Sequence, residues 1–154
     1  MELSISLFGK GGFGVHAFGR VIREAFIGSD ASLYVALAVE YDTVVRGGIS
    51  NCHLIVSEKS CNPVVEGKSD VSIYFKTSWA ILRTREEVCY LSIPREANQH
   101  ISESVRGYVL LGMLVARQYI PLSKEAIQSA ILIECRAPRM LLMNHGAFEK
   151  GLHL

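Results

Sequence analysis

The pattern of apolar and polar residues along the chain predicts an α/β fold. Residues 3–8 alternate and then run apolar, which favours a central β-strand. Residues 15–26 carry apolar side chains at helical spacing with charged residues outside that stripe, as is typical of an amphipathic helix. Residues 32–38 are again strand-like. This order predicts two parallel strands joined by a right-handed crossover.

The rest of the chain continues with strand-like runs and then becomes helical. Strands are expected at residues 52–57, 71–75 and 88–93, a short helix at 78–85, and further helices over 103–119, after a Ser123 cap and from Pro138. Strands with helices between the first two and gathered at the end predict a single Rossmann-like three-layer domain over residues 1–154. Its sheet is expected to be mostly parallel.

A glycine-rich loop lies between the first strand and the first helix. Gly9, Gly11 and Gly14 fit the pattern G-x-G-x-x-G, and Gly12 lies between them. Glycine permits tight turns and close backbone approach, and the free N–H groups that begin a helix can bind an anion. Two interpretations stay open here. The glycines either let the helix pack tightly on the sheet or hold a phosphate.

A second glycine-containing segment follows the second predicted strand. Arg46 precedes Gly47 and Gly48, and Tyr41 lies just upstream. A guanidinium group offers a rigid fork of donors for a carboxylate or a phosphate. A solvated surface turn is the alternative. We expect Arg46 to face an interface or ligand near the glycine loop, because both segments follow the carboxyl ends of strands expected to be parallel.

Composition narrows the function classes. The chain has 154 residues, of which 49% are hydrophobic, and a net charge of only +1. Such a chain is expected to bury apolar surface against a partner, and it lacks the basic stripe that nucleic acid requires. No apolar run approaches the length of a membrane span, and no signal-peptide pattern follows Met1. We therefore expect a cytoplasmic protein.

The cysteines and histidines indicate no metal site or catalytic set. Cys52, Cys61, Cys89 and Cys135 are scattered without a C-x-x-C pair, so neither an iron–sulfur cluster nor a zinc site is predicted, and the thiols are expected to be reduced. His16 is interpreted as a surface or cap residue of the first helix.

Two further residues of the first half have their own interpretations. His53 is interpreted as a core or edge residue of a strand. Glu40 ends the second strand, where a dinucleotide-binding fold places its ribose-binding acid.

Four pieces of the sequence together resemble a known family. They are the glycine loop, the segment from Tyr41 through Arg46-Gly47-Gly48, residues 108–112, and Asn144 with residues 147–151. On these pieces the chain is similar to the gamma subunit or domain of the 2-oxoacid:ferredoxin oxidoreductases. That family acts on pyruvate, 2-oxoglutarate, 2-oxoisovalerate or indolepyruvate.

The resemblance implies a role within a larger enzyme. Such a complex decarboxylates a 2-oxoacid oxidatively with thiamine diphosphate and Mg²⁺, passes electrons through iron–sulfur clusters to ferredoxin, and usually makes an acyl-CoA. These cofactors belong to other subunits, so the chain is expected to bind thiamine-diphosphate-binding and ferredoxin-like subunits, or a second copy of itself, and to be inactive alone. We expect no catalytic or metal-binding residues. The expected cofactor-binding or interface residues are Gly9, Gly11, Gly12, Gly14, Tyr41, Arg46, Gly47 and Gly48.

Two alternatives remain open. One is a stand-alone dinucleotide-binding oxidoreductase that uses the glycine loop and Glu40. The other is a non-catalytic regulatory or interaction protein that keeps the gamma fold. Three departures from the family pattern point to it, because Phe13 replaces the usual glutamine, Asp42 replaces a common glycine, and the region 70–94 is short.

Overall fold

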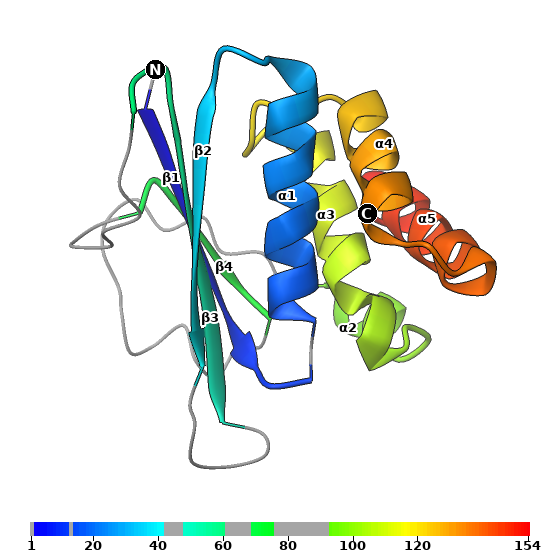
Figure 1. Cartoon of the computed structure of the whole chain (residues 1–154). Coiled ribbons are helices and arrows are strands. Elements are labelled where there is room, and N and C mark those ends of the chain that lie inside the picture. The colour runs from blue at the N-terminus through cyan, green and yellow to red at the C-terminus, as the bar shows by residue number, and fades with distance from the viewer. Residues whose placement is uncertain (1, 13, 42–47, 61–68, 76–92) are drawn as a thin grey trace.

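A computed structural model describes residues 2–12, 14–41, 48–60, 69–75 and 93–154 of the chain. The described strands are β1 (Glu2–Lys10), β2 (Tyr34–Tyr41), β3 (Ile49–Ser57) and β4 (Val71–Tyr74). The helices are α1 (Val15–Ser29), α2 (Arg95–Asn98), the 3₁₀ helix η2 (Glu103–Val105), α3 (Arg106–Ala116), α4 (Lys124–Glu134) and α5 (Pro138–Leu152). The strands form one layer, and the described helices all lie on the same side of it (Figure 1).

The sheet is mixed, with the strand order β2-β3-β1-β4. β3 is antiparallel to both of its neighbours, and only β1 and β4 pair in parallel among the described strands. The expectation of an α/β domain is confirmed, whereas the mostly parallel, three-layer Rossmann-like arrangement is wrong for the described residues. The reason is the connection from β2 to β3, because residues 42–48 are too few for the crossover that a parallel pair needs.

The predicted unit of β1, α1 and β2 is present in a modified form. β1 and β2 run in the same direction, as predicted, but β3 lies between them. α1 buries the predicted stripe, which includes Phe18, Ile22 and Phe26, against this sheet. Its other side contacts α4, so that α1 lies between the sheet and the outer helices (Figure 1).

β4 joins the edge of β1 through a side-chain contact as well as through the strand ladder. The carboxylate of Asp70 accepts hydrogen bonds from the backbone N–H and the hydroxyl of Ser4, at 2.8 and 2.9 Å. The Asp70 N–H in turn donates to the Ser4 hydroxyl at 2.9 Å. These bonds hold the start of β4 in register with β1.

The C-terminal helices largely follow the sequence predictions. The Ser123 hydroxyl accepts from the N–H of Ala126 at 3.1 Å, and Pro138 opens α5, so both predicted helix starts are confirmed. The helix expected over residues 103–119 is instead divided into η2 and α3, and it ends at Ala116. The short helix expected at 78–85 and residues 88–92 of the last expected strand lie outside the described residues. No helix in the described part of the chain is long and apolar enough to cross a membrane.

α3 and α5 pack so closely that their backbones touch. A Cβ added to Gly112 of α3 would collide with the Phe148 carbonyl of α5, and one added to Gly151 would collide with the Val109 carbonyl of α3. Every residue of α3 from Val109 to Leu114 is buried, so neighbouring elements cover this helix on most sides. Two glycines therefore set the distance between the two helices.

Replacing either glycine with alanine should destabilise the fold. We expect Gly112→Ala or Gly151→Ala to lower the free energy of unfolding by about 1–3 kcal/mol or more, because the methyl group would meet rigid backbone rather than a flexible side chain. The matched control is Gly146→Ala on the exposed side of α5, where no atom lies within 4 Å of the added Cβ. This change should stabilise the protein by about 0.5–1 kcal/mol through helix propensity. Denaturant unfolding of the three variants measures both effects, and equal values for Gly146→Ala and Gly112→Ala would contradict the close contact.

Candidate functional site

The two glycine-containing segments meet at one edge of the sheet. β1 and β2 end there and β3 begins there, because Lys10 is paired with Ile49 and Tyr41 with Ser50. The N–H of Gly11 donates a hydrogen bond of 2.9 Å to the carbonyl of Gly48. The structure thus joins the glycine loop to the end of the second predicted segment.

The loop glycines have distinct structural roles. Gly12 and Gly14 have φ values of 96° and 76°, in the left-handed region that side chains disfavour. Gly9 lies so close to α1 that a Cβ there would collide with the Val15 side chain. Tight packing of the loop against the helix is therefore one function of these glycines. Gly14 is also the N-cap of α1, and no described side chain caps the helix there.

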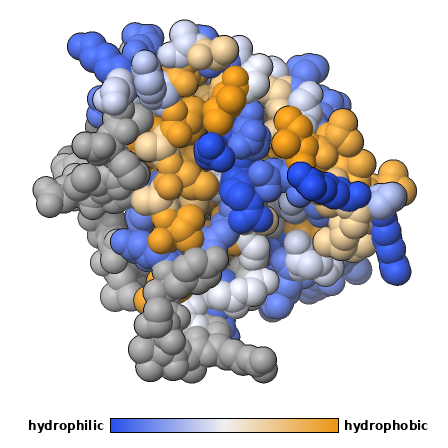
Figure 2. Space-filling view, in the orientation of Figure 1, coloured by the Kyte–Doolittle hydropathy of each residue, from blue (hydrophilic) through white to orange (hydrophobic). Residues whose placement is uncertain are grey.

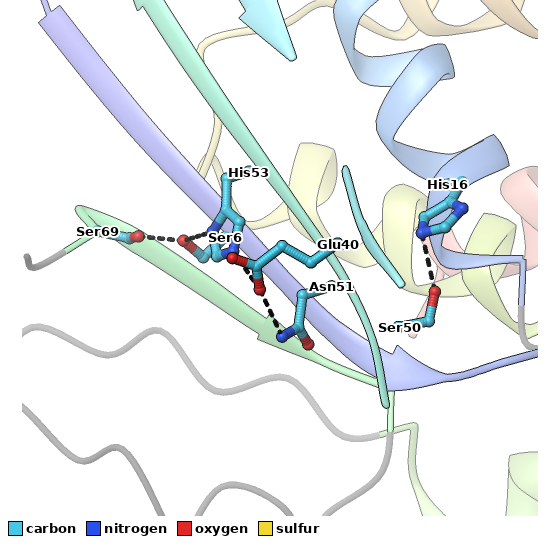
Figure 3. Close-up of polar contacts among 7 residues, drawn as sticks. All are labelled: Ser6, His16, Glu40, Ser50, Asn51, His53 and Ser69. Carbon is cyan, nitrogen blue, oxygen red and sulfur yellow. Dashed lines mark hydrogen bonds and ion pairs between the residues drawn. The ribbon is translucent and has the colours of Figure 1, made fainter. Parts of the chain in front are cut away.

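A histidine connects the start of α1 to the start of β3. The Nε2 atom of His16 lies 2.9 Å from the hydroxyl of Ser50, at hydrogen-bonding distance (Figure 3). Burial lowers the pKa of His16 below its usual value, and the nearby positive charge of Arg20 lowers it further. The neutral imidazole is therefore favoured, and the partly buried His16 side chain lies beside the glycine loop in the first turn of α1.

A small cavity opens beside the N-terminus of α1. It encloses about 120 Å³ between α1, α3 and α5, and it is lined by residues that include Gly14, Tyr108 and Asn144. Asn144 is only 3% exposed, and its Oδ1 atom has no hydrogen-bond partner among the described residues. A water molecule occupies about 30 Å³ in the liquid, so the space suffices for a few waters or for a small polar group.

A second polar cluster lies on the face of the sheet that the described helices leave open. The Ser6 hydroxyl lies 2.9 Å from Nδ1 of His53 and also contacts the Ser69 hydroxyl (Figure 3). The side-chain amide of Asn51 donates to the carboxylate of Glu40 at 3.1 Å, and the same carboxylate oxygen lies 3.7 Å from Nε2 of His53. His53 is buried within β3, so its interpretation as a core or edge residue of a strand is confirmed.

This cluster has the residue types of a hydrolase triad but not its accessibility. Ser6 is only 2% exposed and lies in the middle of β1, so its hydroxyl is a buried group of the sheet. The cluster instead satisfies polar groups that the sheet buries. Glu40 is also poorly placed for a dinucleotide ribose, because β3 separates its strand from β1 and its carboxylate is bound to Asn51.

The described residues provide no metal cluster, and the thiol of Cys52 is not activated. No group of three or more potential metal ligands from His, Cys, Asp or Glu occurs in the part of the chain that the structure covers. Cys52 and Cys135 are free thiols, and burial raises the pKa of Cys52 to about 12. Cys61 and Cys89 lie outside the described residues.

The structure therefore describes some of the predicted site residues and not others. Gly9, Gly11, Gly12, Gly14 and Gly48 are described and lie together at the loop edge of the sheet. The backbone of Tyr41 reaches the same edge at the end of β2, whereas Arg46 and Gly47 lie outside the described residues. His16, Ser50 and Asn144 join the site only in the folded structure, and no local sequence pattern marks their contacts.

Solved structures with the same fold come from 2-oxoacid oxidoreductases. A keto/oxoacid ferredoxin oxidoreductase gamma subunit from Geobacter sulfurreducens PCA matches with a TM-score of 0.70 at 22% identity, over 98% of this chain and 96% of that one. The fold is that of an oxoacid oxidoreductase gamma subunit. Pyruvate oxidoreductase subunit PORC from Thermotoga maritima matches with a TM-score of 0.72 at 18% identity, over 99% of this chain and 96% of that chain.

The same fold also occurs as a part of a longer chain. The 2-oxoglutarate:ferredoxin oxidoreductase from Magnetococcus marinus, with 2-oxoglutarate, coenzyme A and succinyl-CoA bound, matches over 99% of this chain with a TM-score of 0.78 and 20% identity. This chain spans 30% of the length of that one. No family model and no curated protein matches the sequence. The solved structures nevertheless come from the family that the sequence resembles, and each of them matches nearly the whole of this chain.

The lowered pKa of His16 predicts a pH dependence of stability. The unfolded chain binds the His16 proton more readily than the folded chain, so stability should fall as the pH drops below the unfolded value of about 6.5. His16→Gln removes this titration and should flatten that part of the stability curve. Ser50→Ala keeps the imidazole and should retain the wild-type slope. Denaturant unfolding between neutral and mildly acidic pH measures the slopes, and identical slopes in wild type and His16→Gln would contradict the assignment.

Proposed function

We propose that this chain is a gamma-type subunit of a multi-subunit, thiamine-diphosphate-dependent 2-oxoacid:ferredoxin oxidoreductase. The observation that supports this most is the match to the Geobacter gamma subunit, which extends over nearly the full length of both chains. The complex would decarboxylate a 2-oxoacid oxidatively, usually to an acyl-CoA. This subunit would act through assembly rather than through catalytic residues of its own.

The loop edge of the sheet is the part of the chain that we propose as the interface or ligand-facing site. The bond between Gly11 and Gly48 supports this, because it brings the two glycine-containing segments together. The cavity beside Asn144 adjoins the same loop through Gly14. Thiamine diphosphate, Mg²⁺ and the iron–sulfur clusters would be held by partner subunits, and coenzyme A by the assembled complex.

Exposed apolar side chains on the outer helices fit a chain that is covered in a complex. Leu132 and Ile133 of α4 are 60% and 58% exposed, and Leu142 of α5 is 76% exposed. Hydrophobic surface gathers over these helices in Figure 2. Surface of this kind commonly marks a protein–protein interface.

The dinucleotide-binding alternative has less support from the geometry. A dinucleotide site needs its ribose-binding acid on a strand beside the glycine-loop strand. Here β3 occupies that neighbouring position, and Glu40 is hydrogen-bonded to Asn51.

Purification of the tagged full-length chain from its native cells tests the proposed assembly. We expect a thiamine-diphosphate-binding subunit and a ferredoxin-like subunit to co-purify, and the complex to reduce ferredoxin with a 2-oxoacid while the isolated chain does not. Omission of this chain from the reconstituted complex should abolish or strongly reduce that activity. A complex that forms and reaches full activity without it would overturn the proposal and favour a regulatory role.

Arg46→Ala tests the proposed site within that complex. A lost charge-assisted hydrogen bond is worth roughly 1.5–3 kcal/mol, so assembly affinity or activity should fall about tenfold or more. The melting temperature of the isolated chain should stay unchanged. Arg95→Ala, which removes an exposed arginine of α2, outside the glycine loop and outside the exposed apolar surface of α4 and α5, is the matched control and should affect neither property. Wild-type assembly and activity in Arg46→Ala would assign Arg46 to a solvated turn.

A further inference from the structure

β2 is an edge strand of the described part of the sheet. It pairs with β3 on one side, and no described strand pairs with the other. The side chains of Val35, Ala36, Leu37 and Ala38 are partly exposed, and Val39 is 39% exposed, whereas most of the neighbouring strand β3 is buried. A hydrophobic strip runs along the surface where Figure 1 places β2, beside the hydrophilic outer surface of α1 (Figure 2).

The sequence of this strand lacks the devices that usually protect an edge. Natural edge strands carry lysine, proline, bulges or inward-pointing charges that prevent pairing with another chain. β2 reads Tyr-Val-Ala-Leu-Ala-Val-Glu-Tyr, with no proline and no lysine, and its single charge is near its end at Glu40. No described strand pairs with the outer N–H and C=O groups of residues 35–39, and these groups form a template for another strand.

The central five residues of β2 read the same in both directions. Val-Ala-Leu-Ala-Val is a palindrome centred on Leu37. Antiparallel pairing with a second copy would place Leu37 opposite Leu37, Ala36 opposite Ala38, and Val35 opposite Val39, with a two-fold axis at the centre. An interface of this kind must be self-complementary, which the palindrome provides.

We propose that the β2 edge is a homodimerisation surface on which two copies of this chain pair their β2 strands antiparallel, in the register centred on Leu37. This proposal rests on β2 alone and does not depend on the proposed enzyme complex. The described four-stranded sheets of the two copies then become one continuous sheet, and each copy supplies hydrogen-bond partners to the outer backbone groups of residues 35–39 in the other.

One face of the paired β2 strands would carry larger apolar side chains and the other face would carry alanines, and both suit this register. The Leu37 side chain lies against Gly19 of α1, so Leu37, Val35 and Val39 share the face that packs on the helices. Ala36 and Ala38 point to the opposite face, on the same side as His53, which is paired with Ala38. On that face the join would be made by four small methyl groups. Cross-strand pairs of β-branched side chains, such as Val35 with Val39, stabilise a sheet.

A charge design tests both the surface and the register. In the double variant A36E/A38E the new carboxylates of the two copies would stand directly opposite one another, and like charges in that position are destabilising. Sedimentation of the full-length wild type should show a dimer of the 17.0 kDa chain, and A36E/A38E should weaken dimerisation by about tenfold or more. Melting temperatures of both proteins check that the fold is retained.

The rescue variant distinguishes this register from a general loss of the interface. A36K/A38E introduces just as many charges, but the register pairs each lysine with a glutamate of the other copy. This variant should dimerise, and A36K/A38K mixed with A36E/A38E should form a heterodimer. Hydrogen exchange of the β2 amides should slow with increasing concentration in wild type and not in A36E/A38E.

Three outcomes would overturn the proposal. They are a wild-type chain that stays monomeric at its highest soluble concentration, a dimer that A36E/A38E leaves intact, and a folded A36K/A38E variant that remains monomeric. None of them bears on co-purification of the chain with enzyme subunits, so failure here and failure of the proposed function are distinguishable.

Discussion

The antiparallel insertion of β3 between β1 and β2 is the constraint on which the rest of the structure depends. It makes β1 and β2 end at the edge where β3 begins, and this places the glycine loop beside Gly48. It also moves Glu40 away from the glycine-loop strand and onto Asn51. Because β3 lies between β1 and β2, β2 is the strand at that edge of the described sheet.

The elements of this fold were predictable where a local pattern determines them. The apolar stripe of α1, the Ser123 cap and the proline that opens α5 all depend on neighbouring residues, and all three agree with the structure. Strand direction was not predictable in the same way, because side chains alternate with a period of two in parallel and antiparallel strands alike. The short connection at residues 42–48 was the available signal, since it permits only an antiparallel return.

In the candidate site too, local sequence patterns predicted some features and not others. The glycine spacing identified the loop from Gly9 to Gly14. The structure shows why glycine is needed there, because the backbone is left-handed at Gly12 and Gly14. The contact of His16 with Ser50 and the unpartnered amide oxygen of Asn144 arise from segments far apart in the sequence. No spacing rule connects such residues, so only the fold brings them to the site.

The bonds between Ser4 and Asp70 join positions 66 residues apart, and this separation has a consequence for the kinetics of folding. β1 is the first strand of the chain, yet it cannot complete its hydrogen-bond ladder until β4 is available. Long-range strand pairing of this kind loses conformational entropy when the intervening loop closes, before any stabilising contact forms. Folds that depend on such pairing therefore fold more slowly than helical bundles. During synthesis, the edge of β1 that pairs with β4 would remain unpaired after its other edge has paired with β3, until residues beyond position 70 have been made.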